Sequence, residues 1–139
     1  MKFSATKYAT KEEAMADILA SKDTGCRTKK DAEAWLIRHI PLEKYWQGKI
    51  LRWLRQAYPE AMAWKAAAGP YSRAGIPDIS VIYKGIYIGM EVKRPFIGEL
   101  SRIQEVTIRQ MKAAGAIVGV VSFERDAAKL MDEARRKAR

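Results

Sequence analysis

Two carboxylates and a lysine interrupt the mostly apolar, strand-like segments of GIPDISVIYKGIYIGMEVKRP, which runs from residue 75 to 95. These residues are Asp78, Glu91 and Lys93. Because side chains alternate along a β-strand, Glu91 and Lys93 point to the same face, roughly 6–7 Å apart. A tight turn at Lys84-Gly85 is close to midway between Asp78 and Glu91, so a hairpin would bring the two acids together.

This pattern is suited to a divalent ion such as Mg²⁺ or Mn²⁺. Mg²⁺ prefers hard oxygen ligands and usually keeps several waters, so two carboxylates and the backbone carbonyl of Val92 would be enough to hold it. Such an ion polarises a phosphate oxygen and lowers the pKa of bound water, and Lys93 would stabilise the developing charge. Taken singly, the residues also have structural interpretations, with Asp78 as a turn cap and Glu91–Lys93 as an exposed pair.

The elements that must position these residues follow from the hydrophobic pattern. Strands are predicted at AMAWKAA, DISVIY, IYIGMEVKR and AIVGVVSF. Helices are predicted over residues 42–57 and 100–114 and from residue 124 onward. The order α-β-β-β-α-β-α is satisfied by a small mixed central sheet flanked by helices, an α/β fold. Trp35, Trp46 and Trp53 fall at core positions, whereas Trp64 has no clear assignment.

The first forty residues predict two short helices. Each starts with a threonine, Thr10 or Thr28, followed three residues later by an acid, as in a capping box. The segment KKDAEAWL resembles the opening helices of HU-type DNA-binding proteins. We therefore expect residues 1–40 to form a helical hairpin appended to a second domain at residues 41–139, where it packs, dimerises or touches DNA.

The amino-acid composition limits the kinds of partner, metal site and cellular location that are expected. The net charge of +10 favours a polyanionic partner, either nucleic acid or an acidic membrane surface. A single cysteine and a single histidine exclude an intrachain disulfide and a zinc site of several cysteines or histidines. The start of the sequence lacks an apolar run, and the longest uncharged apolar stretch is too short to span a bilayer. These features predict a cytoplasmic protein without a membrane segment.

Together, the motifs resemble the VRR-NUC branch of the PD-(D/E)-x-K nuclease superfamily. The pair Pro77-Asp78 supplies PD, and Glu91-Val92-Lys93 supplies the acid-x-Lys element. The segment GELSRIQ, a helix and a strand after AAG then follow in the order of that branch. The resemblance covers about residues 42–123 and implies a restriction-endonuclease-like fold.

The resemblance implies roles for particular residues. Asp78 and Glu91 match the metal-binding acids, and Lys93 matches the catalytic lysine. Gln104 matches a glutamine in the helix after the last motif strand. Glu43 is the best match for a glutamate on the helix before the sheet, where it would complete the metal or water shell.

The resemblance also implies a substrate and a setting. We expect a DNA endonuclease that acts on Holliday junctions or other branched DNA as a homodimer, in repair or recombination, in a bacterial or phage-infected cell. The candidate DNA contacts are Lys65, Tyr71, Ser72, Arg73 and Arg94. Two other classes stay open, a non-catalytic DNA-binding module and a phage-type protein–protein adaptor.

Overall fold

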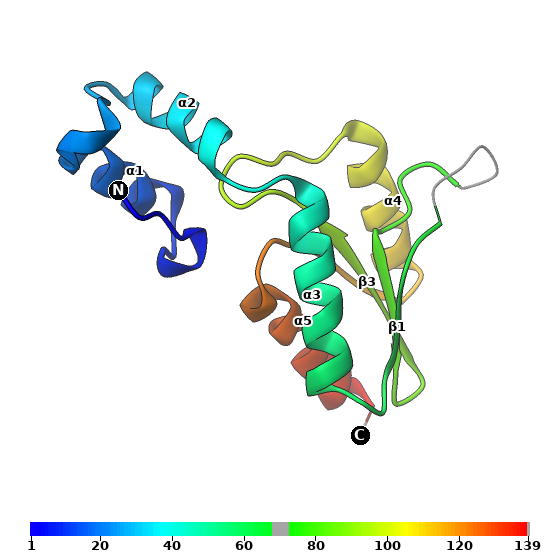
Figure 1. Cartoon of the computed structure of the whole chain (residues 1–139). Coiled ribbons are helices and arrows are strands. Elements are labelled where there is room, and N and C mark those ends of the chain that lie inside the picture. Colours follow the sequence, from blue (N-terminus) through cyan, green and yellow to red (C-terminus); the bar gives the residue numbers. More distant parts are fainter. Residues whose placement is uncertain (68–72, 139) are drawn as a thin grey trace. The chain divides into compact units, whose positions relative to one another are not determined.

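The computed structural model describes residues 1–67 and 73–138, and these residues form two compact units (Figure 1). One unit comprises Met1–Leu42 together with Arg94–Gly98. The other comprises Glu43–Lys93 and Glu99–Arg139 and contains the whole sheet.

A four-stranded mixed sheet forms the centre of the larger unit (Figure 1). Its strands lie in chain order: β1 (Met62–Lys65), β2 (Ile79–Tyr83), β3 (Ile86–Val92) and β4 (Ile117–Val121). The first three are antiparallel neighbours, and β4 runs parallel to β3. The β2–β3 turn has positive φ at both central residues, Lys84 and Gly85, as a tight two-residue hairpin requires.

One face of the sheet carries the hydrophobic core. Strand β3 places Ile88, Met90 and Val92 on this face, all fully buried. Helices α3 (Glu43–Ala57) and α5 (Glu124–Lys137) contact the strands and each other. Ile50 and Leu54 are the buried centre of the α3 stripe. This packing fixes where the first residues of α3 lie relative to the sheet.

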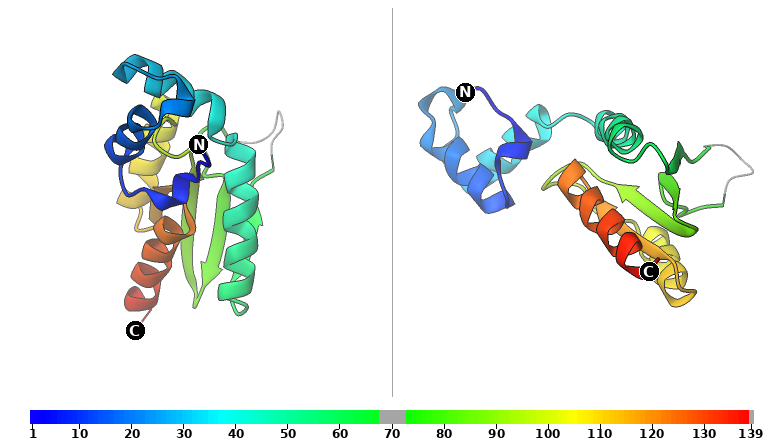
Figure 2. Two further views of the ribbon diagram at one scale, coloured as in Figure 1. Left: turned by 60° about the vertical axis from the view of Figure 1, so that its left-hand side comes forward. Right: turned by 90° about the horizontal axis from the view of Figure 1, so that it is seen from below.

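The opposite face of the sheet is only partly covered. Helix α4 (Arg102–Ala113) lies on this face, because its Gln104 bonds to Glu91, which alternates with the core residues of β3. Farther along the same face, Met62 and Ile82 are directly paired on β1 and β2 and are 65% and 44% exposed. The uncovered part therefore lies over β1 and β2 (Figure 2).

The smaller unit is a pair of helices, α1 (Lys11–Ala20) and α2 (Lys29–His39). Thr10 and Thr28 cap them by accepting bonds from backbone N–H groups, and Thr28 is part of a full capping box. The short 3₁₀ turns η1 (Ala5–Lys7) and η2 (Lys22–Thr24) were not expected. Within this unit the guanidinium of Arg94 donates to the carbonyls of Ile37, Ile40 and Pro41 at the end of α2.

The fold class predicted from sequence is confirmed, and each predicted strand and helix is present with ends that differ by one or a few residues. Helix α3 begins at Glu43, directly after the predicted Leu42. None of the described helices has the length and apolar character needed to cross a membrane.

Candidate active site

Three carboxylates from three elements converge at one end of the sheet. Glu43 is the first residue of α3, Asp78 precedes β2, and Glu91 is near the end of β3. One oxygen of each lies within 4.8 Å of the others. Three negative charges this close repel one another. A cation bound by all three carboxylates would offset that repulsion.

Asp78 is held by the neighbouring strand and by close backbone packing. Its Oδ2 accepts a hydrogen bond of 2.8 Å from the N–H of Val92. The preceding Pro77 is buried against Gly89, where an added Cβ would lie only 2.9 Å from the proline ring. A glycine at position 89 therefore allows the PD pair to approach β3 closely enough for the bond to Val92.

The loop before Asp78 is fixed to helix α4. Gly75 has a φ of 81°. A Cβ there would lie 2.5 Å from the hydroxyl oxygen of Thr107 and 2.9 Å from the carbonyl oxygen of Ile103. Both the left-handed backbone and the close approach favour glycine. The segment that carries Asp78 thus contacts β3 on one side and α4 on the other.

Glu91 is fully buried and is oriented by α4. The Nε2 of Gln104 donates a 2.9 Å hydrogen bond to Glu91 Oε1. Gln104 Oε1 in turn accepts from the N–H of Ser101, whose hydroxyl caps the helix at the N–H of Gln104. Among the described residues, Glu91 Oε2 has no hydrogen-bond partner although it is buried. A buried carboxylate oxygen without a partner is costly unless a proton or a cation satisfies it.

The pKa values of the two glutamates reflect this crowding. Burial, followed by the adjacent carboxyl of Asp78, raises the pKa of Glu91 to about 8. Burial also raises the pKa of Glu43, and the positive charge of Lys93 partly offsets that effect. The site therefore takes up a proton near neutral pH unless another positive charge is present.

Lys93 supplies a positive charge beside the acids. Its Nζ is 3.9 Å from Glu43 Oε2, and its side chain is 13% exposed. Its backbone is anchored to β4, because its N–H donates to Val121 and its carbonyl accepts from the hydroxyl of Ser122. The ammonium is thus held near the three carboxylates by a rigid strand end.

The predicted DNA contacts have different surroundings. Lys65 and Arg73 are exposed in the larger unit. Arg94 belongs to the smaller unit, where carbonyls at the end of α2 occupy its guanidinium. Tyr71 and Ser72 lie outside the described residues. A DNA contact by any of these five residues stays a prediction, as does metal binding by the carbonyl of Val92.

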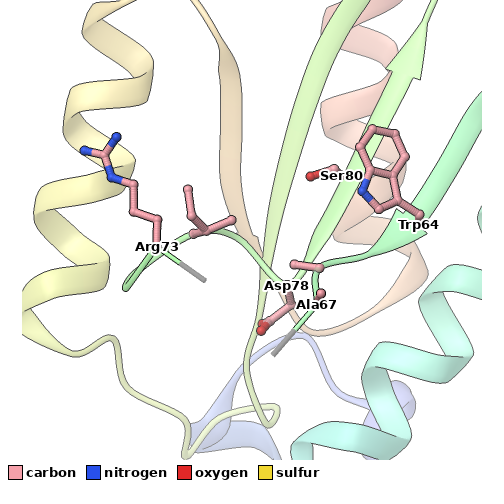
Figure 3. A pocket seen from close by; sticks show the side chains of 7 residues that line it. Trp64, Ala67, Arg73, Asp78 and Ser80 are labelled. Carbon is pink, nitrogen blue, oxygen red and sulfur yellow. The ribbon is translucent and has the colours of Figure 1, made fainter. Parts of the chain in front are cut away.

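A hollow of about 400 Å³ adjoins the carboxylates (Figure 3). Trp64 and Ser80 lie on one side of it, Arg73 lies on the other, and Asp78 lies between them. The remaining lining residues are small or aliphatic: Ala66, Ala67 and Ile76. Asp78 is thus shared by the hollow and the acid cluster.

Sequence reasoning missed two groups that position the site. One is the N–H of Val92, which bonds to Asp78; strand pairing alone does not reveal such a contact. The other is Ser101, which holds Gln104. The sequence does contain a signal for Ser101, because Ser-x-x-Gln before the apolar stripe of a helix is a capping-box pattern.

A scan against protein-family models and a search of curated proteins find no match to this chain. A search of solved structures finds one described as "VRR_NUC domain". The similarity covers 62% of this chain and 94% of that chain, with 22% sequence identity and a TM-score of 0.52. The mixed sheet with helices on both faces is therefore similar in fold to a VRR_NUC domain.

Proposed function

We propose that this protein is a metal-dependent endonuclease of the VRR-NUC branch that hydrolyses phosphodiester bonds in DNA. The observation that carries the proposal is the convergence of Glu43, Asp78 and Glu91 beside the ammonium of Lys93. The VRR_NUC fold supports it. The net charge of +10 also supports it, because a basic protein attracts the phosphate backbone.

The residues present fit a hard divalent cation such as Mg²⁺ or Mn²⁺. All three converging groups are carboxylates, the ligand type that such ions prefer. Glu91 Oε2 is buried without a partner among the described residues, so it is the oxygen most in need of a cation. The raised pKa of Glu91 supports the same conclusion, because without a cation the crowded site takes up a proton.

Each side chain then has a distinct task. Asp78 and Glu91, with Glu43 beside them, hold the ion, which supplies Lewis-acid polarisation of the phosphate and a lower pKa for water. The Lys93 ammonium stabilises the negative charge that grows on the phosphate oxygens. Gln104 orients Glu91. Hydrolysis adds the hydroxyl of water to phosphorus, breaks one P–O ester bond and transfers a proton to the departing sugar oxygen.

The test is a cleavage assay with four-way junction, flap and duplex DNA in Mg²⁺, Mn²⁺ or EDTA. We expect metal-dependent cleavage that Asp78→Ala and Lys93→Ala each reduce by at least about 100-fold, the scale of losing an electrostatic stabiliser. DNA binding should be largely retained. Lys129→Ala and Glu105→Gln, at exposed positions on α5 and α4, are matched controls that should cut normally.

Two outcomes would contradict the proposal. If the protein binds DNA but cuts none of the substrates with either metal, it is a binding module. If Asp78→Ala and Lys93→Ala both cut as fast as the unaltered protein, the activity belongs to a different site.

We also propose branched DNA as the preferred substrate and a homodimer as the active form. Both rest on the family resemblance, since junction cleavage needs two sites and therefore two copies. Relative cleavage of the three DNA structures tests the first, and the molecular mass in solution tests the second. A monomer that cuts junctions no faster than duplex would overturn both.

A further inference from the structure

We infer that the hollow beside Asp78 receives an unpaired nucleobase next to the phosphate that is cut, with the base stacked on Trp64. The inference rests on the proposed nuclease function. The substrate feature that the site selects is then an unstacked nucleotide at the cleavage position, and Trp64, which is not part of the acid cluster, is the residue that recognises it.

Trp64 differs from the other three tryptophans in its surroundings. Trp35 stacks on His39, Trp46 packs edge-to-face against Phe123, and Trp53 packs against Tyr58. Trp64 has no aromatic or cation partner among the described residues. It is half-buried on β1 and lines the hollow. An aromatic ring that faces a cavity without a partner is available for stacking.

The hollow has the size and the lining for a flat heterocycle. Its volume of about 400 Å³ is within the usual range of small-molecule sites. Ala66 and Ala67 have short side chains that leave space beside the ring. Ser80, also in the lining, is 6% exposed, and its hydroxyl is held 2.9 Å from that of Tyr87. It adds a polar group to an otherwise mostly apolar wall.

The position of the hollow identifies the occupant. Because Asp78 is both a wall of the hollow and a member of the acid cluster, a group in the hollow is adjacent to a phosphate at the cluster. In DNA, the flat aromatic group attached next to a phosphate is a base. Exposed Arg73, which lines the hollow, places positive charge beside it for the backbone.

The base that enters must be unpaired. Within a duplex both faces of a base are covered by its neighbours, so stacking on a protein ring requires a nucleotide that is already single-stranded or is extruded. Extrusion costs least where the DNA is branched or interrupted. The hollow therefore provides a physical reason for selecting branched DNA that does not depend on reading sequence.

The experiment follows 2-aminopurine fluorescence, which stacking on an aromatic ring quenches. The probe is placed at the unpaired nucleotide beside the cleavage position of a flap substrate, and binding is measured in EDTA, without cleavage. We expect quenching by the unaltered protein, loss of quenching in Trp64→Ala and recovery in Trp64→Phe. Met62→Ala is the control, because Met62 is on the same strand and face but is not among the described residues that line the hollow.

Cleavage provides the second measurement. We expect Trp64→Ala to reduce kcat/KM on the flap by about tenfold or more, the range for loss of one stacked base. An abasic residue at the same position of the DNA should reduce the kcat/KM of the unaltered protein by a similar factor. It should change the kcat/KM of Trp64→Ala little, because that variant has already lost the stacking ring. If Trp64→Ala quenches and cuts like the unaltered protein, the inference is wrong. If Asp78→Ala still cuts DNA, the proposed nuclease site is wrong. The fluorescence measurement in EDTA does not depend on cleavage, so it still tests whether the base stacks on Trp64.

Discussion

Gln104 and Glu91 are joined by a 2.9 Å hydrogen bond between helix α4 and strand β3. The bond uses Oε1 of Glu91 and leaves the buried Oε2 without a partner among the described residues. Ser101 fixes the amide of Gln104, so the orientation of the carboxylate is set by the start of a helix. In the proposed function Glu91 is a metal ligand, and a residue that orients such a ligand contributes to metal affinity and to activity.

Gln104→Ala should therefore weaken the binding of Mn²⁺ by about 10- to 100-fold, the usual effect of removing a group that orients a metal ligand. Isothermal titration calorimetry measures this without substrate. Gln110→Ala, at an exposed position on the same helix, should bind the ion normally. Equal affinities for the two variants would show that Gln104 does not orient the site.

The raised pKa of Glu91 predicts how stability depends on pH. Its pKa is about 8 in the folded protein against an ordinary value of 4.5, so the folded state holds a proton that the unfolded state releases. The stabilisation is complete below about pH 4.5 and is lost as the pH rises toward 8. In EDTA the free energy of unfolding should fall by a few kcal/mol over that range, at up to about 1.4 kcal/mol per pH unit.

Urea denaturation at several pH values measures this dependence, and Glu91→Gln should flatten it. Mn²⁺ should raise the melting temperature more at pH 8 than at pH 6, because the ion binds the deprotonated carboxylate. A slope in EDTA that is identical in the unaltered protein and Glu91→Gln would assign the titration to another group.

Gly89→Ala should disturb the site from the middle of a strand. The added methyl group would lie 2.9 Å from the ring of Pro77 and must displace it, together with Asp78. We expect overpacking to lower the free energy of unfolding by about 1–3 kcal/mol. We also expect cleavage to be slower by about 10- to 100-fold, since small displacements of catalytic groups reduce the rate strongly.

Gly48→Ala is the matched control for this substitution. Gly48 is within α3, where an added methyl group meets only the end of the Arg52 side chain at 3.2 Å. It should raise the free energy of unfolding by about 0.5–1 kcal/mol through helix propensity and leave cleavage unchanged. If Gly89→Ala behaves like this control, the contact with Pro77 does not position Asp78.

Arg94→Ala should destabilise the smaller unit. The guanidinium donates to the carbonyls of Ile37, Ile40 and Pro41, which the end of helix α2 otherwise leaves without partners. The free energy of unfolding should fall by about 1–3 kcal/mol, which chemical denaturation measures. Arg38→Ala, exposed on α2, is the control. Reduced DNA affinity with unchanged stability would instead support the predicted phosphate contact.

The fold class and the arrangement within the hairpin could be predicted from the sequence alone. Alternation along β3 predicted that Glu91 and Lys93 share a face opposite Met90 and Val92, and the turn at Lys84-Gly85 placed Asp78 across from Glu91. These inferences succeed because strand alternation and turn geometry are local properties of the backbone. The threonine caps of α1 and α2 were readable for the same reason.

Tertiary packing, in contrast, brings side chains from separate elements together. It brought Glu43 to within 4.8 Å of the other acids and paired Glu91 with Gln104, joining residues from two helices to the hairpin. It also directed the Val92 N–H to Asp78 and Arg94 to the end of α2. These contacts depend on how helices pack on the sheet, and a shift of one or two ångströms would break them, whereas sequence periodicity specifies only a face.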